Sequence, residues 1–217
     1  MKLYPIIFEM ALTSNSEAKR FGDLIRQEMD QYKGLELRIQ ILRLRTFLGE
    51  NGFIRLGSEG TGRVVYGISG TDFVIKVAKN LNGLIGGVAQ NRTEVKLKSE
   101  CLTDKYFTKI YDYDEEQYLW IIAEKVQAGL SEEQLLDLLV KSLEGSDPEF
   151  LDNIRNSPDP FFKISDVLSG GTDVVLNSWG QGLSDELNKC STNADDFHEE
   201  NWGLRNDGSL VVLDYGF

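Results

Sequence analysis

Apolar side chains recur at helical spacing in the first part of the chain. Between residues 16 and 32 they fall every three or four positions, which predicts an amphipathic helix that stops at Gly34. Residues 35–48 fit both a strand, by alternation, and a helix, and we favour the helix. Residues 1–50 are therefore predicted to form a helical extension ahead of the main fold.

After Gly52 the pattern changes to short β-branched runs between glycine-rich turns, which is typical of strands. The first three runs predict an antiparallel meander, and a helix-like segment then separates them from two further strands. In order, the predicted elements are strands 53–56, 63–68 and 73–77, a helix over 88–102, and strands 108–112 and 117–126. This order of strands and helix is uncommon.

Beyond Gly129 helical patterns predominate. Ser131 and Gln134 have the spacing of a capping box at the start of a helix. The predicted elements are a helix over 131–143, a proline- and aspartate-rich loop with a short helix over 145–160, a helix over 174–189, and a hairpin over 203–213. The turn of this hairpin reads Asn-Asp-Gly-Ser, a common turn sequence.

The composition indicates a folded, acidic protein. A chain of 217 residues, 41% of them hydrophobic, can bury a core. The formal net charge of -12 opposes binding to nucleic acid and to anionic membrane surfaces. It suits a basic partner protein, although an acidic surface also serves solubility alone. We expect no signal peptide, and no apolar stretch approaches the roughly 20 residues of a membrane span.

Cysteine and histidine are scarce. Cys101 and Cys190 form no CxxC pair, and His198 is the single histidine. We therefore expect neither a disulfide framework nor a zinc site, and we expect a reducing cytosol as the compartment.

Candidate chemistry begins at a glycine-rich turn. Residues 57–62 join two apolar strands, and glycine lets backbone amides approach a phosphate closely. Lys76 emerges from the apolar strand that follows, where it would meet phosphate oxygens or simply face solvent. Glu94, on the next predicted helix, is the expected partner of Lys76, with Glu100 as an alternative.

The end of the sequence carries the strongest signal. Asp196 is followed by Asn201 and, after the predicted hairpin, by Asp214-Tyr215-Gly216. These residues resemble the aspartate and asparagine of the protein-kinase catalytic loop and the Asp-Phe-Gly motif that follows it, with tyrosine in place of phenylalanine.

The glycine-rich turn resembles a second kinase motif. Gly57, Gly60, Gly62 and Val64 match the glycine-rich loop that covers the phosphates of ATP, and Glu59 stands where the middle glycine is usual. In the same order along the chain, Lys76 and Glu94 resemble the lysine of the third strand and its glutamate partner on the C-helix.

A further match lies between these motifs. Glu124 and Val126 resemble the hinge whose backbone binds adenine. The resemblance covers residues 53–217, and its motifs occur in the family's order, which is more specific than any one of them.

The resemblance implies an α+β, bilobal protein-kinase-like fold. Its N-lobe, residues 51–127, would be a five-stranded antiparallel sheet with a C-helix, and its C-lobe, residues 128–217, would be minimal and mostly helical. ATP and Mg²⁺ are the implied cofactors. Asp196 would serve as the catalytic base and Lys76 would steady the phosphates, while Asn201 and Asp214 would hold magnesium.

Two departures qualify the likeness. Ala194 and Asp195 replace the usual histidine and arginine before the catalytic aspartate, and the sequence ends at Phe217, ahead of any activation segment. This architecture resembles the compact protein kinases that some bacteriophages encode. We therefore expect a small serine/threonine-protein kinase that phosphorylates a protein substrate, in the host cytoplasm if it is phage-encoded.

Two alternatives stay open. One is a pseudokinase or an inhibitory protein-binding module of kinase fold, which the departures at Glu59 and Phe217 favour. The other is a small-molecule kinase of the aminoglycoside or choline type, whose Asp-x-His-x-x-Asn loop Asp196, His198 and Asn201 also resemble.

Overall fold

The computed structural model describes residues 14–56, 62–79, 86–170, 173–191 and 199–215. The chain divides into two compact units. The first holds the described residues up to Val95 and those from Lys109 to Lys125, and the second holds Lys96 to Thr108 and Val126 to Tyr215. Within the described part, no helix is long and apolar enough to cross a membrane.

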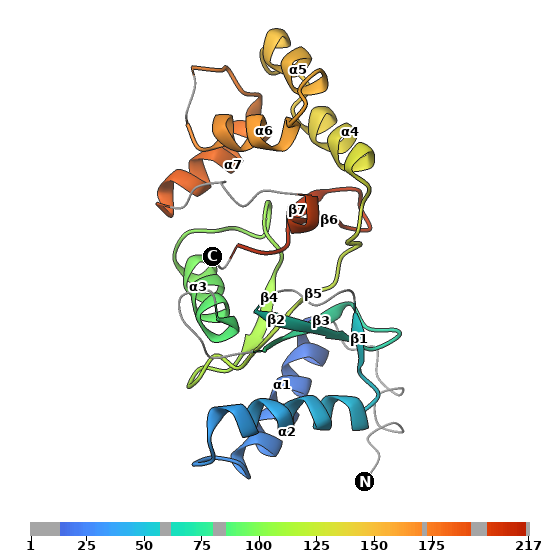
Figure 1. Ribbon diagram of the computed structural model, residues 1–217, viewed down its shortest axis with the longest axis vertical. Helices are drawn as coiled ribbons and strands as arrows, with labels where there is room; N and C mark the ends of the chain where they lie inside the picture. Colours follow the sequence, from blue (N-terminus) through green and yellow to red (C-terminus); the bar gives the residue numbers. More distant parts are fainter. Residues whose placement is uncertain (1–13, 57–61, 80–85, 171–172, 192–198, 216–217) are drawn as a thin grey trace. The chain divides into compact units, whose positions relative to one another are not determined.

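The first unit is built on an antiparallel sheet of order β1-β2-β3-β5-β4 (Figure 1). Its strands are β1 (Ile54–Leu56), β2 (Arg63–Gly67), β3 (Phe73–Ala78), β4 (Ile110–Tyr113) and β5 (Trp120–Glu124). The predicted α+β class and the five-stranded antiparallel sheet are confirmed, because each predicted strand overlaps an observed one.

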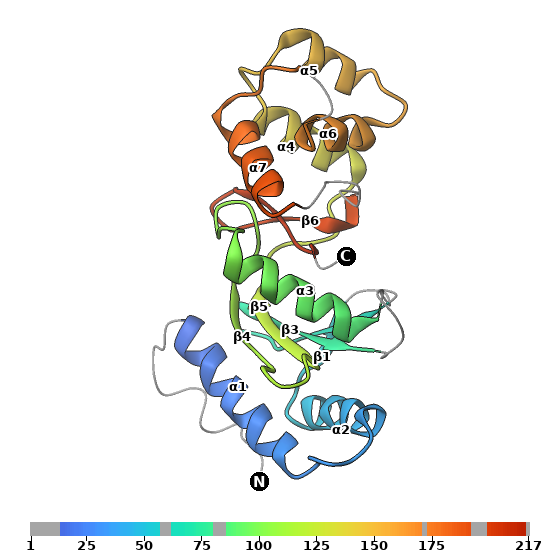
Figure 2. The ribbon, with the colours of Figure 1, turned by 90° about the vertical axis from the view of Figure 1, so that its left-hand side faces the viewer.

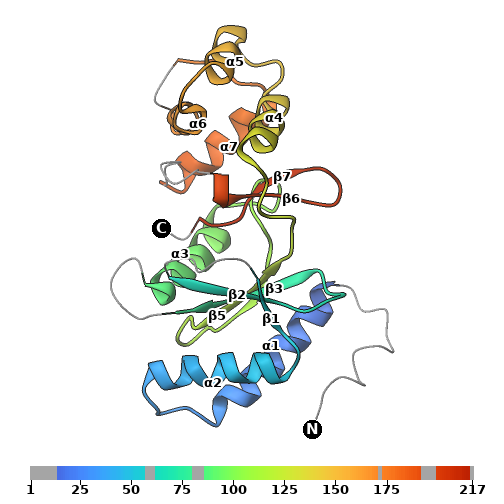
Figure 3. The same cartoon turned by 45° about the vertical axis from the view of Figure 1, so that its right-hand side comes forward.

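Helices cover both faces of this sheet (Figure 3). The helices α1 (Ser14–Asp30) and α2 (Leu37–Glu50) lie on one face, and α3 (Gly87–Glu100) lies on the other. The helix favoured for residues 35–48 is thus confirmed. Leu44 and Leu48 of α2 are fully buried beneath the sheet, which explains why the ambiguous pattern resolves as a helix with one apolar stripe.

Side chains of β3 alternate between the two faces, as strand geometry requires. Phe73, Ile75 and Val77 are fully buried in the cluster formed with α1 and α2. Each contributes roughly 1.5–3 kcal/mol through burial of its apolar surface. Val74 packs instead with the cluster on the α3 side, and Lys76 therefore also faces α3.

The second unit is mostly helical (Figure 2). Its elements are α4 (Glu132–Ser142), α5 (Pro148–Arg155), α6 (Pro160–Leu168), α7 (Ser178–Lys189), a short 3-10 helix (Glu199–Asn201) and the hairpin strands β6 (Trp202–Leu204) and β7 (Leu210–Val212). The predicted hairpin and the capping box are confirmed: Ser131 Oγ accepts from Gln134 N at 3.2 Å, and Gln134 Oε1 accepts from Ser131 N at 3.1 Å.

Two helices of the second unit begin at a proline. Pro148 and Pro160 each begin a helix, a position where the missing N–H of proline costs nothing. Asp147 and Asp159 cap these helices by accepting backbone N–H bonds. The short helix predicted within residues 145–160 is confirmed as α5, whereas α6, which begins at the end of that range, was not predicted.

The two cysteines form a disulfide. Cys101 follows α3, Cys190 caps the end of α7, and their Cα atoms lie 5.6 Å apart. The expectation that they stay unpaired is wrong. Their separation of 89 residues in sequence gives no local motif, so only the fold of the second unit brings them together.

Candidate functional site

Lys76 and Glu94 form a buried ion pair in the first unit. Lys76 Nζ, on β3, donates to Glu94 Oε1, on α3, at 2.6 Å. Their side chains are 10% and 0% exposed. The pairing predicted from the sequence is confirmed, whereas the alternative partner, Glu100, is exposed at the end of the same helix.

A third charged side chain shares this carboxylate. Arg63 Nη1, on β2, donates to Glu94 Oε2 and, at 3.4 Å, to Asn91 Oδ1. Asn91, also on α3 and fully buried, donates to the backbone oxygen of Tyr118 at 2.8 Å. Sequence reasoning missed Arg63 and Asn91. For Arg63 the signal in the sequence was a cation that begins an apolar strand directly after the glycine-rich turn.

Strand register decides which side chains share a face with Lys76. Val65 lies opposite Lys76 in the pairing of β2 with β3, whereas Val64 lies opposite Val77. Val64 is 2% exposed and packs in the cluster with α1 and α2. Val64, predicted to contact the nucleotide, therefore lies on the face of the sheet away from Lys76, since successive side chains of a strand point to opposite faces. The half-buried Val65 lies on the same face as Lys76.

The glycine-rich turn is described only at its end. Gly57 and Gly60 lie outside the described residues, and Gly62 is buried. The carbonyl oxygen of Gly62 accepts a hydrogen bond from Lys79 N at 2.8 Å. A Cβ atom added at Gly87, the first residue of α3, would lie 2.1 Å from that oxygen. The beginning of α3 therefore requires glycine to pack against the end of the turn.

The predicted hinge residues lie at the end of β5. Glu124 N donates to Lys109 O at 2.9 Å, and Glu124 Oε2 accepts from Lys109 N at 3.2 Å. Lys125 N donates to Asp72 O at 2.9 Å, which extends the pairing of β5 with the start of β3. Val126 follows and is half-buried. Their proposed contact with adenine stays a prediction.

In the second unit, Asn201 and Asp214 lie at the open end of the β6–β7 hairpin. Trp202 and Val212 are directly opposite each other, and Leu213 N donates to Asn201 O at 2.8 Å. Because Asp214 directly follows Leu213, the backbones of both predicted metal ligands meet at this end. Asn201 is buried and Asp214 is half-buried.

Tyr215 fixes the chain just after Asp214. It is 1% exposed, its hydroxyl donates to Thr108 O at 3.1 Å, and its ring lies edge-on to Phe107 with the centroids 5.1 Å apart. The tyrosine thus gains a backbone hydrogen bond that a phenylalanine would lack, and it holds the segment that carries the aspartate.

The oxygen chemistry of the hairpin end suits magnesium. An amide oxygen from Asn201 and a carboxylate from Asp214 are ligands of the kind that Mg²⁺ prefers, with water and phosphate oxygens completing its shell. Within the described ranges, no group of three or more His, Cys, Asp and Glu side chains is placed to hold a metal. The predicted catalytic Asp196 lies outside the described residues.

No protein-family model and no curated protein matches the sequence. The functional assignment therefore rests on the residues themselves. In the first unit the structure joins Lys76, Glu94 and Arg63, and in the second it brings the backbones of Asn201 and Asp214 to one end of a hairpin.

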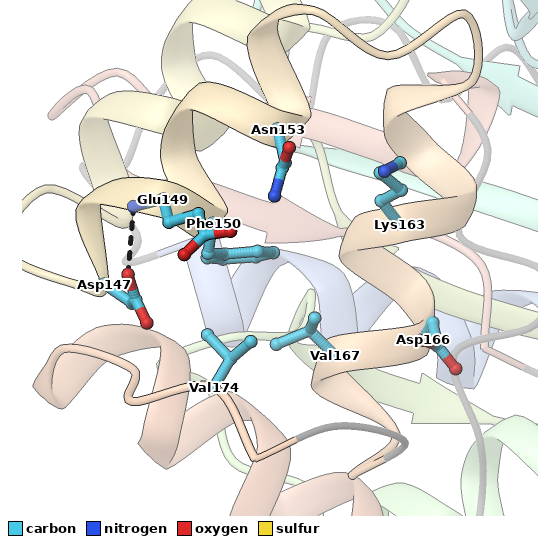
Figure 4. A pocket seen from close by; sticks show the side chains of 8 residues that line it. All are labelled: Asp147, Glu149, Phe150, Asn153, Lys163, Asp166, Val167 and Val174. Atoms are coloured by element: carbon cyan, nitrogen blue, oxygen red, sulfur yellow. Dashed lines mark hydrogen bonds between the residues drawn. The ribbon is translucent and has the colours of Figure 1, made fainter.

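A cavity of about 320 Å³ lies beside α5 and α6 in the second unit (Figure 4). Phe150 and Val167, both 6% exposed, form its apolar floor, and polar side chains from both helices surround it. One of these, Asp147, is engaged in capping α5 through Glu149 N at 2.9 Å. Of the predicted site residues that the structure describes, none lines this cavity.

Proposed function

We propose that the protein is an ATP-dependent phosphotransferase, and that it acts as a small serine/threonine-protein kinase. The observation that carries the proposal is the buried pair of Lys76 and Glu94, contributed by β3 and α3. A strand ammonium paired with a helix carboxylate, in a chain with a glycine-rich turn ahead of that strand, is the arrangement that kinases use to bind the phosphates of ATP.

The burial of Lys76 and Glu94 is itself an argument that the ion pair serves a function. Desolvating an ammonium and a carboxylate costs several kcal/mol per ion, and apolar side chains of similar volume stabilise a core at least as well. On its β5 side Lys76 borders apolar side chains, because Ile121 lies opposite it and both Ile121 and Ala123 are fully buried. A charged pair in such surroundings is more readily explained by ligand binding than by stability.

The residues of the second unit supply the remaining roles. Asn201 and Asp214 would hold Mg²⁺, which neutralises charge that develops on the transferred phosphoryl group. Asp196 would accept the proton of the attacking hydroxyl. Glu124 and Val126 would contact adenine through the backbone. The proposal requires that both sets of residues act on the same nucleotide.

The substrate is proposed to be a protein with a basic surface. The formal net charge of -12 attracts cationic partners and repels nucleic acid, so electrostatic steering favours a basic protein. We propose the cytoplasm as the compartment, which for a phage-encoded kinase is that of the host.

The decisive experiment follows the γ-phosphate. The pure protein is incubated with γ-labelled ATP and Mg²⁺, with and without a cell lysate, beside Lys76→Met, Asp196→Ala and Asp214→Ala variants. Asp137→Ala is the matched control, since Asp137 is an exposed aspartate of α4. We expect labelled protein with the wild type and with the control, and a loss of at least a hundredfold in the three variants.

The outcomes separate the alternatives. Binding of ATP by the wild type without transfer of label to any protein favours the pseudokinase. Failure of the wild type to bind ATP or ADP in calorimetry overturns the phosphotransferase proposal. Transfer that persists unchanged in Asp196→Ala and Asp214→Ala assigns the chemistry to other residues.

A further inference from the structure

We infer that Arg63 is a positioning residue for the proposed phosphate site. Through Arg63, the carboxylate of Glu94 is shared between two cations, Arg63 and Lys76. This inference rests on the proposed function. Arg63 begins β2 directly after the glycine-rich turn, and its guanidinium donates to Glu94 Oε2 while Lys76 Nζ donates to Glu94 Oε1. Each cation thus contacts a different oxygen of one carboxylate.

The arrangement sets the charge that Lys76 presents to a ligand. A lysine with a carboxylate to itself is largely neutralised, and its attraction for a phosphate is correspondingly weaker. The positive charge of Arg63 offsets part of the negative charge of Glu94. Because the guanidinium stays charged at every physiological pH, this offset does not change with pH over that range.

Arg63 also restricts where the carboxylate can lie. Its side chain is 5% exposed and Glu94 is fully buried, so neither has freedom to move into solvent. Nη1 of Arg63 additionally donates to Asn91 Oδ1, one helical turn before Glu94, and Asn91 is itself held by Tyr118 O. The network therefore fixes Glu94, and through it Lys76, to β2, to α3 and to the segment before β5.

The same contact lies beside Gly62, the last residue of the glycine-rich turn. Arg63 is the residue after Gly62, whose carbonyl oxygen accepts from Lys79 N and packs against Gly87 of α3. Two backbone contacts and one guanidinium thus hold the end of the turn against α3. Loss of the guanidinium is expected to disturb the phosphate end of a bound nucleotide and to leave the adenine end unaffected.

The test compares a ligand that carries both adenine and phosphates with ligands that carry only one of the two. Calorimetry measures the affinities of the wild type, Arg63→Met and Arg63→Lys for ATP with Mg²⁺, for adenosine and for inorganic tripolyphosphate. We expect Arg63→Met to bind ATP and tripolyphosphate roughly tenfold or more weakly, because a charge-assisted contact is lost, and to bind adenosine as the wild type does. Arg63→Lys restores the charge and is expected to recover part of the loss.

Arg45→Met is the matched control. Arg45 Nε, on α2, donates to Tyr66 Oη at 3.1 Å, so this variant removes an arginine contact from the other face of the same strand. We expect it to leave the ratio of ATP affinity to adenosine affinity unchanged, whatever its effect on stability.

The outcomes are distinguishable. If the wild type binds ATP and folded Arg63→Met keeps the wild-type ratio of ATP to adenosine affinity, Arg63 is merely structural and the inference is overturned. If Arg63→Met does not fold, Arg63→Lys decides, because one ammonium cannot reproduce the planar contact with both Glu94 and Asn91, and wild-type ATP affinity in this variant would overturn the inference. A wild type that binds neither ATP nor tripolyphosphate defeats the proposed function itself.

Discussion

Lys76 Nζ and Glu94 Oε1 are 2.6 Å apart although 18 residues separate them in the sequence. The contact joins the third strand of the sheet to the helix that covers it. Because Glu94 also accepts from Arg63, one carboxylate serves cations from two neighbouring strands. The buried cluster of Lys76, Glu94 and Arg63 therefore contributes both to the stability of the first unit and to its proposed chemistry.

Replacing Glu94 by glutamine removes the negative charge of the side chain and nearly keeps its shape. Glutamine keeps the size and one hydrogen-bonding oxygen but leaves Lys76 and Arg63 buried without their shared counter-charge. Breaking a buried pair in this way costs about 3–5 kcal/mol. We expect the urea midpoint of unfolding to fall accordingly and ATP binding to weaken. Glu100→Gln, at an exposed position of the same helix, should change neither quantity. Equal midpoints for the two variants would contradict the prediction.

Because Gly87 of α3 lies against Gly62, the last residue of the glycine-rich turn, one methyl group added at Gly87 is expected to lower stability strongly. Gly87→Ala would place a Cβ 2.1 Å from Gly62 O and 2.8 Å from Ala78 Cα, both backbone atoms that a rotamer change cannot relieve. We expect a destabilisation of about 1–3 kcal/mol, measured by denaturant unfolding. Gly49→Ala in α2 has no atom within 4 Å and is expected to be neutral or to stabilise by about 0.5–1 kcal/mol.

Much of the sheet was readable from local pattern. Phe73, Ile75 and Val77 alternate with Val74 and Lys76, and this alternation gave both the strand and the exceptional position of the lysine. The helix that carries Glu94 followed from the same kind of reading. The prediction of the ion pair succeeded because the kinase motifs pair a lysine of the third strand with a glutamate of the following helix.

The sequence was less informative where strand register, or contact between residues far apart in the sequence, decides which side chains meet. Whether Val64 or Val65 lies beside Lys76 depends on a shift of one residue, which a glycine motif with an atypical middle position does not fix. The contact of Arg63 with Glu94 needs the position of β2 relative to α3. The kinase motifs pair Lys76 with Glu94 but assign no role to Arg63, so they do not provide this contact.

The disulfide was missed for a similar reason. Cys101 and Cys190 belong to the ends of two helices whose packing no local pattern predicts. The expectation of a reducing cytosol rested partly on these residues remaining thiols, and the disulfide removes that ground. The compartment stays a prediction.

Reduction of this bond should lower stability. The disulfide closes a loop with a sequence separation of 89, which restricts the unfolded chain and typically contributes about 2–4 kcal/mol. For a chain of this length we expect thiol reductant to lower the melting temperature by on the order of 10 °C. The Cys101→Ala/Cys190→Ala double variant should melt at the same temperature with and without reductant. Alkylation of both cysteines in the unreduced native protein would show that the bond does not form.

The hairpin that carries Asn201 and Asp214 should respond to acid through its turn. Asp207 Oδ1 accepts from Ser209 Oγ at 2.6 Å and from Ser209 N at 2.9 Å, and these hydrogen bonds, with the hydroxyl first, hold the pKa of Asp207 below its ordinary value. A lowered pKa means that the folded state favours the ionised form. The contribution to stability is therefore present above the ordinary pKa of an aspartate and is lost as pH falls through the lowered value.

Removing the hydroxyl isolates this effect. In Ser209→Ala only the backbone donor remains, so we expect the pKa of Asp207, followed by carboxyl ¹³C NMR titration, to rise toward its ordinary value. The difference in unfolding free energy between Ser209→Ala and the wild type should shrink as pH falls below the ordinary pKa of an aspartate and through the lowered pKa of Asp207. Asp207→Asn serves as the control, because an amide oxygen does not titrate and its contribution should not change over this range. An unchanged pKa of Asp207 in Ser209→Ala would contradict the assigned cause.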